Sequence, residues 1–293
     1  MNELQRTLDE IILLYQLEPN TKDIFVEGIS DKLILERFIE KNGLDDIKVL
    51  QVHEINFSSL YTQNPKIKSN NRAKLIELNT LLESNFSEKL IGISIIIDRD
   101  FDEVLNRLPL GRYLYVTDYN SLELYLFNPH TLDIFYKNII RSFPINGAET
   151  IRLLTPILID NFFVRLALKK DGHIPDDKFT PFNKTFLIDK SKLKVTFDPH
   201  KHIQKVLNNV RKTSELQDFI YHFNEAKEKA SFGHKNIIRG HDFIALLYEL
   251  INKVNNSIGL TIDTLERSMF QCIDYSKLKT EPLFSNLLKK YQV

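Results

Sequence analysis

The chain has 293 residues, of which 43% are apolar and 27% are charged, as is ordinary for a globular protein with a packed core. Lysine plus arginine and aspartate plus glutamate both number 39, which excludes a uniformly basic coat for nucleic acid but leaves room for a local basic patch. The single cysteine, Cys272, allows no internal disulfide and favours a reducing compartment. We therefore expect a cytoplasmic protein.

The first residues predict a helix rather than a targeting segment. Residues 1–21 carry apolar side chains at helical spacing and three acids among the first ten residues, which does not suit a secretory signal. No run of eighteen apolar residues predicts a membrane span. We expect an amphipathic N-terminal helix that packs on the following domain, and no membrane association.

Residues 22–128 predict a Rossmann-like α/β domain with a central parallel sheet. Alternating strands and helices favour parallel strands joined by helical crossovers. Ser30 is expected to cap the first of these helices. The predicted strands are 23–28, 47–52, 90–98 and 112–117, with helices at 30–43, 71–86 and 101–107 and a loop at 53–70.

Residues 129–293 predict a mainly α-helical C-terminal domain. Several stretches in this range have apolar side chains at helical spacing. Two short strand-like pieces interrupt them and predict a small β-hairpin at about 184–197.

Acidic side chains follow three of the four predicted strands. Glu27 ends the first strand, and the third, in "IIIDRDFD", leads to Asp98, Asp100 and Asp102. Glu123 lies shortly after the fourth strand. The carboxyl ends of parallel strands share one edge of an open sheet, where ligands bind. We therefore expect these acids to gather on one rim.

Gathered carboxylates repel one another unless a positive charge lies among them, and a hard divalent cation serves this purpose well. Mg²⁺ prefers carboxylate oxygens, retained waters and substrate phosphates, and Mn²⁺ is an alternative. We expect Glu27, Asp98, Asp100 and Asp102 to bind the metal, with Glu27 also a candidate general acid/base for phosphodiester cleavage. Asp31 suits the first turn of its helix through the helix dipole and is a secondary candidate.

The motifs "VEGISD" and "IIIDRDFD" resemble those of the TOPRIM domain, the metal-dependent module of topoisomerases, bacterial primases and OLD-family nucleases. The resemblance covers roughly residues 22–118. It implies that Glu27 is the general acid/base and that Asp98 and Asp100 bind Mg²⁺. It also implies the TOPRIM variant of the Rossmann-like fold.

A narrower resemblance covers more of the chain. The stretches "DYNSLELYLF" and "NIIRGHDFIALL" resemble stand-alone TOPRIM proteins typified by the AriB effectors of the PARIS anti-phage defence system. The resemblance implies a toxic nuclease that acts on tRNA and is held inactive by a partner ATPase of the ABC type. It favours RNA over DNA as substrate, and a homodimer as the active form. The sequence itself contains no G-x-x-x-x-G-K-[ST] loop.

Basic residues supply further candidates for phosphate binding. Arg72 and Lys74 lie at the start of the second predicted helix, where the helix N-terminus also favours an anion. Arg239 and His241 lie in the late motif named above. Residues 184–240 hold 12 lysines and arginines against 6 acids, which is consistent either with a phosphate-tracking surface or with a solvated face.

Two other functions remain open from the sequence. A haloacid-dehalogenase-like phosphatase also has an Asp-x-Asp strand, although that family expects it on the first strand and here two βα units precede it. The later Asp-Asp pair at 176–177 does not follow an apolar strand. The second alternative is a non-catalytic TOPRIM subunit that regulates an ATPase and binds only a structural ion.

Overall fold

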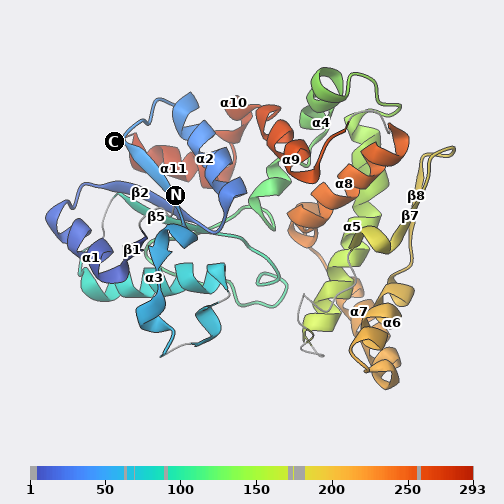
Figure 1. Cartoon of the computed structure of the whole chain (residues 1–293), viewed down its shortest axis with the longest axis horizontal. Coiled ribbons are helices and arrows are strands. Elements are labelled where there is room, and N and C mark those ends of the chain that lie inside the picture. Colours follow the sequence, from blue (N-terminus) through green and yellow to red (C-terminus); the bar gives the residue numbers. More distant parts are fainter. Residues whose placement is uncertain are drawn as a thin grey trace. The chain divides into compact units, whose positions relative to one another are not determined.

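The computed structural model describes residues 5–62, 65–68, 70–88, 92–170, 174, 182–255 and 259–292. The chain divides into two compact units (Figure 1). The first comprises Met1–Leu122 together with Asp274–Val293, and the second comprises Glu123–Ile273.

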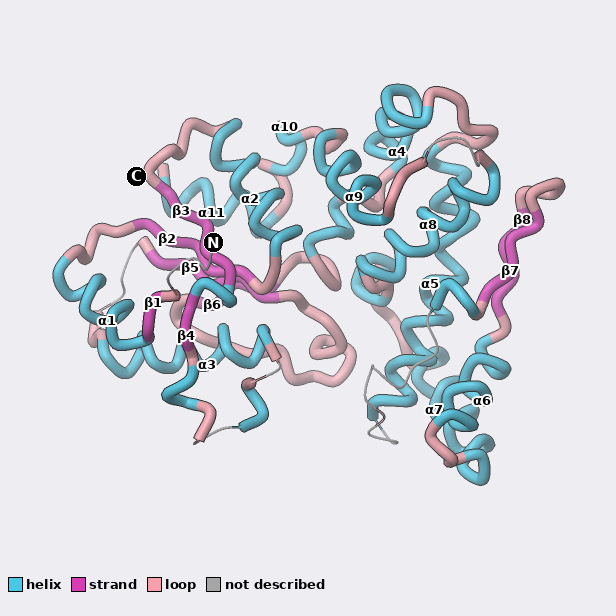
Figure 2. Tube along the Cα trace, viewed as in Figure 1, coloured by secondary structure: helices cyan, strands magenta, loops and turns pink. Residues whose placement is uncertain are grey.

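A four-stranded parallel sheet organises the first unit (Figure 2). The strands lie in the order β3 (Ile47–Gln51), β2 (Lys22–Val26), β5 (Ile93–Ile97) and β6 (Leu114–Val116). The two central strands are rich in buried β-branched and aromatic residues, as strands covered on both faces should be. The predicted α/β architecture with a central parallel sheet is confirmed.

Helices cover both faces of this sheet (Figure 1). Helices α1 (Leu8–Leu17) and α3 (Asn71–Asn85) pack with Phe25 and Ile95 in one apolar core. On the other face lie α2 (Ile29–Lys41) and α11 (Pro282–Tyr291), which meet through an aromatic contact. Side chains alternate along a strand, so successive residues of β2 and β5 enter different layers.

The N-terminal segment contains a short strand as well as the predicted helix. The helix α1 begins after Thr7, whose hydroxyl oxygen accepts a hydrogen bond from the Glu10 N–H at 3.2 Å, and residues 1–4 of the predicted helix lie outside the described residues. The short strand β1 (Arg6–Thr7) pairs in parallel with β4 (Ile55–Asn56), within the segment predicted to be a loop. Two-residue strands carry too little periodicity to be predicted from sequence.

The C-terminal residues return to the first unit, which differs from the prediction of one C-terminal domain at 129–293. This return includes α10 (Tyr275–Leu278) and α11. The Leu283 N–H donates to both carboxylate oxygens of Asp118, at 3.1 and 3.0 Å. The Tyr291 hydroxyl donates to the Gly92 carbonyl at 3.0 Å and exchanges a hydrogen bond with Ser94. The prediction of a mainly helical region extended to residue 293, but it did not indicate the sheet that these helices cover.

The second unit is mainly helical, as predicted. Its long helix α5 packs against α4, α6, α7 and α8. A β-hairpin of two antiparallel strands confirms the prediction at about 184–197. No described helix is both long and apolar enough to cross a membrane. The elements are α4 (Pro129–Phe135), α5 (Gly147–Lys170), β7 (Phe186–Asp189), β8 (Lys194–Phe197), α6 (Pro199–Asn209), α7 (Leu216–Glu228), α8 (Gly240–Val254) and α9 (Ile262–Gln271).

Replacement of Phe284 tests the docking of α11 on the first unit. Phe284 is fully buried, and its ring centroid lies 4.7 Å from that of Phe38. We expect Phe284→Ala to lower the free energy of unfolding by about 3–5 kcal/mol, because it leaves a cavity in the core. The control Asn286→Ala, exposed on the same helix, should change it by less than about 0.5 kcal/mol. Equal values for both variants in urea titrations would contradict this packing.

Candidate functional site

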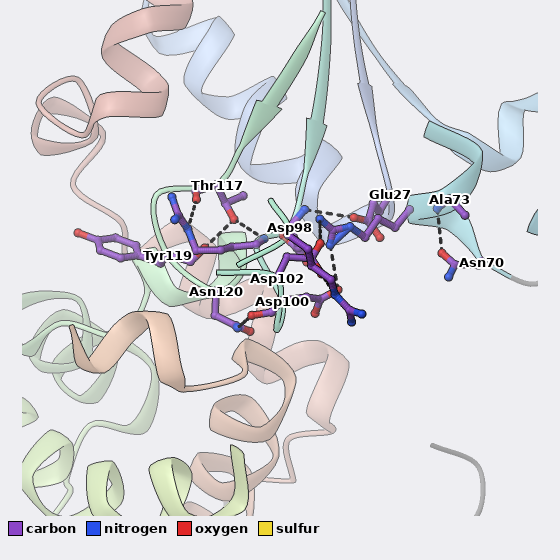
Figure 3. Close-up of polar contacts among 12 residues, drawn as sticks. Glu27, Asn70, Ala73, Asp98, Asp100, Asp102, Thr117, Tyr119 and Asn120 are labelled. Atoms are coloured by element: carbon purple, nitrogen blue, oxygen red, sulfur yellow. Dashed lines mark hydrogen bonds and ion pairs between the residues drawn. The ribbon is translucent and has the colours of Figure 1, made fainter. Parts of the chain in front are cut away.

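Two acidic residues lie at the carboxyl ends of the central strands. Glu27 directly follows β2, and Asp98 directly follows β5. The Asp98 N–H donates to Glu27 Oε1 at 3.1 Å, and the two residues lie together in Figure 3. The structure therefore brings together two acids that are distant in sequence.

Asp31 caps the helix that follows Glu27. The Gly28 N–H donates to Asp31 Oδ2 at 3.0 Å, and the Asp31 side chain is buried. The helix begins at Ile29 with Gly28 as its N-cap, so the prediction that Ser30 caps this helix is wrong. Asp31 in the first turn also interacts favourably with the helix dipole. The hydrogen bond from Gly28 supports a role for Asp31 in stabilising the start of this helix.

The residues after Asp98 form turns, and the helix predicted at 101–107 is absent. Asp100 and Asn106 have φ values of 48° and 51°, which a right-handed helix does not accommodate. The Asp100 N–H donates to the Asn120 carbonyl at 3.0 Å, and Asn120 Nδ2 donates to the Asp100 carbonyl at 2.5 Å. This reciprocal pair, visible in Figure 3, holds the Asp100 backbone against the loop after β6.

Thr117 makes a second connection between the same two loops. The Arg99 N–H donates to the Thr117 hydroxyl at 3.1 Å, and that hydroxyl donates to the Tyr119 carbonyl at 2.6 Å (Figure 3). The Arg99 Nε–H also donates to the Thr117 carbonyl, at 3.0 Å. The Asp-x-Asp segment is thus fixed from the neighbouring strand, and sequence reasoning did not identify Thr117 or Asn120 as its anchors.

Arg72 places a positive charge among the acids. Its guanidinium lies 3.5 Å from Asp100 Oδ2 and 2.6 Å from Asp102 Oδ2. Asp102 Oδ1 also accepts from Arg107 Nε at 3.1 Å. Each Asp102 oxygen therefore already contacts an arginine, so metal binding by Asp102 would require an ion pair to open. The prediction of Asp102 as a metal ligand receives no support from these contacts.

The start of α3 positions Arg72 beside the rim. Asn70 caps this helix, with its Oδ1 accepting from the Ala73 N–H at 2.9 Å (Figure 3). Asn71 Nδ2 donates to the Glu27 carbonyl at 3.2 Å. Lys74 Nζ lies one turn further and contacts Asn71 Oδ1 at 3.5 Å. The predicted basic helix start therefore lies next to Glu27 and the Asp-x-Asp segment.

Glu27, Asp98 and Asp100 supply the donor type that Mg²⁺ prefers. Within the described residues, no three or more His, Cys, Asp or Glu side chains are arranged so that they could hold a metal ion by themselves. Mg²⁺ commonly takes only one or two protein carboxylates and completes its shell with waters and substrate phosphates. Asp100 is 40% exposed, so it is accessible to such a shell. Magnesium binding by these residues therefore stays a prediction, in which the substrate supplies part of the coordination.

The remaining candidates lie in the second unit. Glu123 is 3% exposed, and its Oε1 lies 3.2 Å from His241 Nδ1, while His241 is 74% exposed. Glu123 Oε2 is buried and has no hydrogen-bond partner in the described part of the chain. Arg239 is the half-buried N-cap residue of α8. The Glu123–His241 contact thus connects the stretches "DYNSLELYLF" and "NIIRGHDFIALL".

Asp242 is a structurally important acid that sequence reasoning missed. It is buried and accepts hydrogen bonds from Asn161 Nδ2 at 2.7 Å and from Arg165 Nη2 at 3.1 Å. These bonds connect the first turn of α8 to the middle of α5. Its place beside His241 in a helix start was the only sequence signal, and that signal did not specify its partners.

The basic stretch at 184–240 is partly balanced by acids within the second unit. Lys227 lies 2.5 Å from Asp160 Oδ1, and Lys229 lies 2.7 Å from Glu225 Oε1. These contacts favour a solvated charged face for α7. The lysines near β8 and α6 belong to a different part of the same stretch.

Comparison with known proteins adds no assignment. The chain matches no protein-family model, and no curated protein is found to be similar to it.

The left-handed backbone of Asp100 gives a testable difference between two substitutions. Asparagine tolerates positive φ, whereas a β-branched residue there is strained by about 1–3 kcal/mol. Both Asp100→Asn and Asp100→Val remove the negative charge that faces Arg72. We therefore expect Asp100→Val to unfold at lower urea concentration than Asp100→Asn, by that difference in free energy. Equal stability of the two variants would contradict the backbone geometry of this turn.

Proposed function

We propose that this protein is a Mg²⁺-dependent nuclease of the TOPRIM type that hydrolyses phosphodiester bonds in nucleic acid. The observation that carries the proposal is the hydrogen bond from the Asp98 N–H to Glu27 Oε1, at the carboxyl ends of two adjacent parallel strands. It supports the pairing of a general acid/base with a metal-binding Asp-x-Asp motif. The resemblance of "VEGISD" and "IIIDRDFD" to TOPRIM motifs adds to this support.

In the proposed mechanism each carboxylate has a separate role. Asp98 and Asp100 would hold the divalent cation, which would stabilise negative charge on the phosphoryl oxygens. Glu27 accepts a proton from the attacking water or donates one to the leaving oxygen. The hydrogen bond from Asp98 fixes the orientation of the Glu27 carboxylate, and Arg72 limits repulsion between the acids of the loop.

Gly28 leaves space for a phosphate beside Glu27. Its φ is −147°, a conformation that any residue adopts, and a Cβ built there meets only Asp31 Oδ2, at 3.9 Å. Neither backbone conformation nor packing within the described protein therefore requires glycine. A ligand that approaches the backbone at the start of α2 would require it, as glycines do in other phosphate-binding turns.

We further propose RNA, and specifically tRNA, as the substrate, with the protein acting as the toxic effector of an anti-phage defence system. Support comes from the resemblance to PARIS effectors and from the contact between Glu123 and His241, which lie in the two motifs of that resemblance. An ABC-type ATPase is the proposed inhibitory partner, as the resemblance to PARIS effectors implies, and the lack of a nucleotide-binding loop in the sequence is consistent with it. The active form is proposed to be a homodimer.

Glu27→Gln tests the proposed proton transfer. Glutamine keeps the shape and can still accept from the Asp98 N–H, so we expect normal folding. Loss of a general acid/base typically slows a reaction by about 10²–10⁴-fold. The measurement is Mg²⁺-dependent RNA cleavage by purified protein, together with sequencing of cellular RNA ends. Glu36→Gln, which changes an exposed acid of α2, is the control.

Three outcomes of this and related assays would contradict the proposal or favour one of the two alternative functions. Cleavage by Glu27→Gln at the wild-type rate would contradict the role of Glu27. Release of phosphate from a phosphomonoester, with a phosphorylated Asp98, would favour the phosphatase alternative. No cleavage by the wild-type protein freed from its ATPase, with complex formation intact, would favour the regulatory subunit.

Gly28→Ala tests the approach of a phosphate to the start of α2. We expect unchanged stability, because the added methyl group meets only an ordinary contact, and at least about tenfold weaker cleavage, because the methyl group obstructs the substrate. Gly233→Ala is the matched control, since a Cβ there meets nothing within 4 Å. Equal cleavage rates for the two variants would show that substrate does not approach Gly28.

A further inference from the structure

A cavity in the second unit lies between the β7–β8 hairpin and the start of α6. Its volume is about 340 Å³, within the range of small-ligand sites. The hairpin leads directly into α6, so one continuous segment supplies most of the lining (Figure 1). None of the acids of the strand-end rim lines this cavity.

His202 is the buried polar group in the cavity wall. It is 2% exposed, and neither Nδ1 nor Nε2 has a hydrogen-bond partner among the described residues. Burial, with the charges of Arg165 and Lys205, lowers the pKa of His202 to about 4. The ring is therefore neutral near pH 7, with one nitrogen a donor and the other an acceptor. A buried polar atom without a hydrogen-bond partner lowers the stability of the folded state. A polar ligand that bonds to His202 would remove this cost.

Positive charge surrounds the same space. Lys184, Lys201 and Lys205 line the cavity, and Asp198 is the one acid among the described residues that line it. The Asp198 carboxylate is already occupied, because Oδ1 accepts from the Lys201 N–H at 3.0 Å and Oδ2 lies 3.6 Å from Lys201 Nζ. The N-terminal turn of the eleven-residue helix α6 adds partial positive charge. This combination suits a phosphate group.

An aromatic wall lies beside these charges. Phe197 is half-buried, lines the cavity and contacts His202 edge to face, with ring centroids 5.7 Å apart. Aromatic side chains with neighbouring lysines are a common means of holding a base and its phosphate together. We propose that the cavity binds one nucleoside monophosphate unit, with the phosphate on the lysines, the base against Phe197, and His202 hydrogen-bonded to the nucleoside.

The nucleotide unit has two sources with the same chemistry: a free mononucleotide or one residue of an RNA strand. Isothermal titration without divalent cation separates them, with AMP and UMP as one pair of probes and a five-residue oligouridylate as another. Adenosine, uridine and inorganic phosphate are the partial ligands. Because the assay involves neither metal nor cleavage, its result is independent of the proposed nuclease activity.

We expect a mononucleotide to bind more tightly than its nucleoside or inorganic phosphate. Lys205→Glu should weaken this binding at least tenfold, whereas Lys192→Glu, at an exposed position of the hairpin turn, should leave it unchanged. His202→Phe, which removes both ring nitrogens, should weaken nucleotide binding and spare that of inorganic phosphate. If His202→Phe does not fold, the lysine pair alone decides.

The binding measurements distinguish results that support the proposal from results that contradict it. Binding of the mononucleotide, or of the oligouridylate alone, with the Lys205 dependence above supports the proposal and identifies the source. Three results would overturn it: no binding of either probe at millimolar concentration, inorganic phosphate binding as tightly as AMP, or equal losses in Lys205→Glu and Lys192→Glu.

Discussion

The parallel pairing of β2 with β5 is the constraint on which the candidate site depends. The register that pairs Phe25 with Ile95 makes both strands end at the same edge, so Glu27 and Asp98 come within hydrogen-bonding distance. The loop after β6 then holds the Asp-x-Asp segment through Asn120. The buried sheet supplies the rigidity that the proposed catalytic pair would need, while both acids remain partly exposed at its rim.

Charge balance at this rim comes from the start of α3. Arg72 approaches both Asp100 and Asp102, and Arg107 occupies the other oxygen of Asp102. Both oxygens of Asp102 contact arginines, and one oxygen of Asp100 lies near Arg72. Glu27 and Asp98 lie together at the strand ends. Such a division agrees with the preference of Mg²⁺ for few protein carboxylates and several other oxygen ligands.

Much of this organisation could be predicted from residue patterns. The apolar strands, the acids at their ends and the β-hairpin followed from periodicity and position. The turn after Asp98 could not be predicted, because the residues 101–107 suit a helix and the bonds that hold the Asp100 backbone come from Asn120, which lies beyond the next strand. The return of α11 was missed because the sequence predicted only a mainly helical region to residue 293, and helical content alone does not indicate which neighbour a helix packs against.

We propose that the strand-end carboxylates bind a divalent cation. The most direct measurement is Mn²⁺ binding followed by electron paramagnetic resonance, with Asp98→Asn compared against wild type and against Asp45→Asn at an exposed loop position. We expect at least about tenfold weaker Mn²⁺ binding in Asp98→Asn, because a carboxylate ligand is lost, and no change in Asp45→Asn. Equal binding by all three proteins would contradict it.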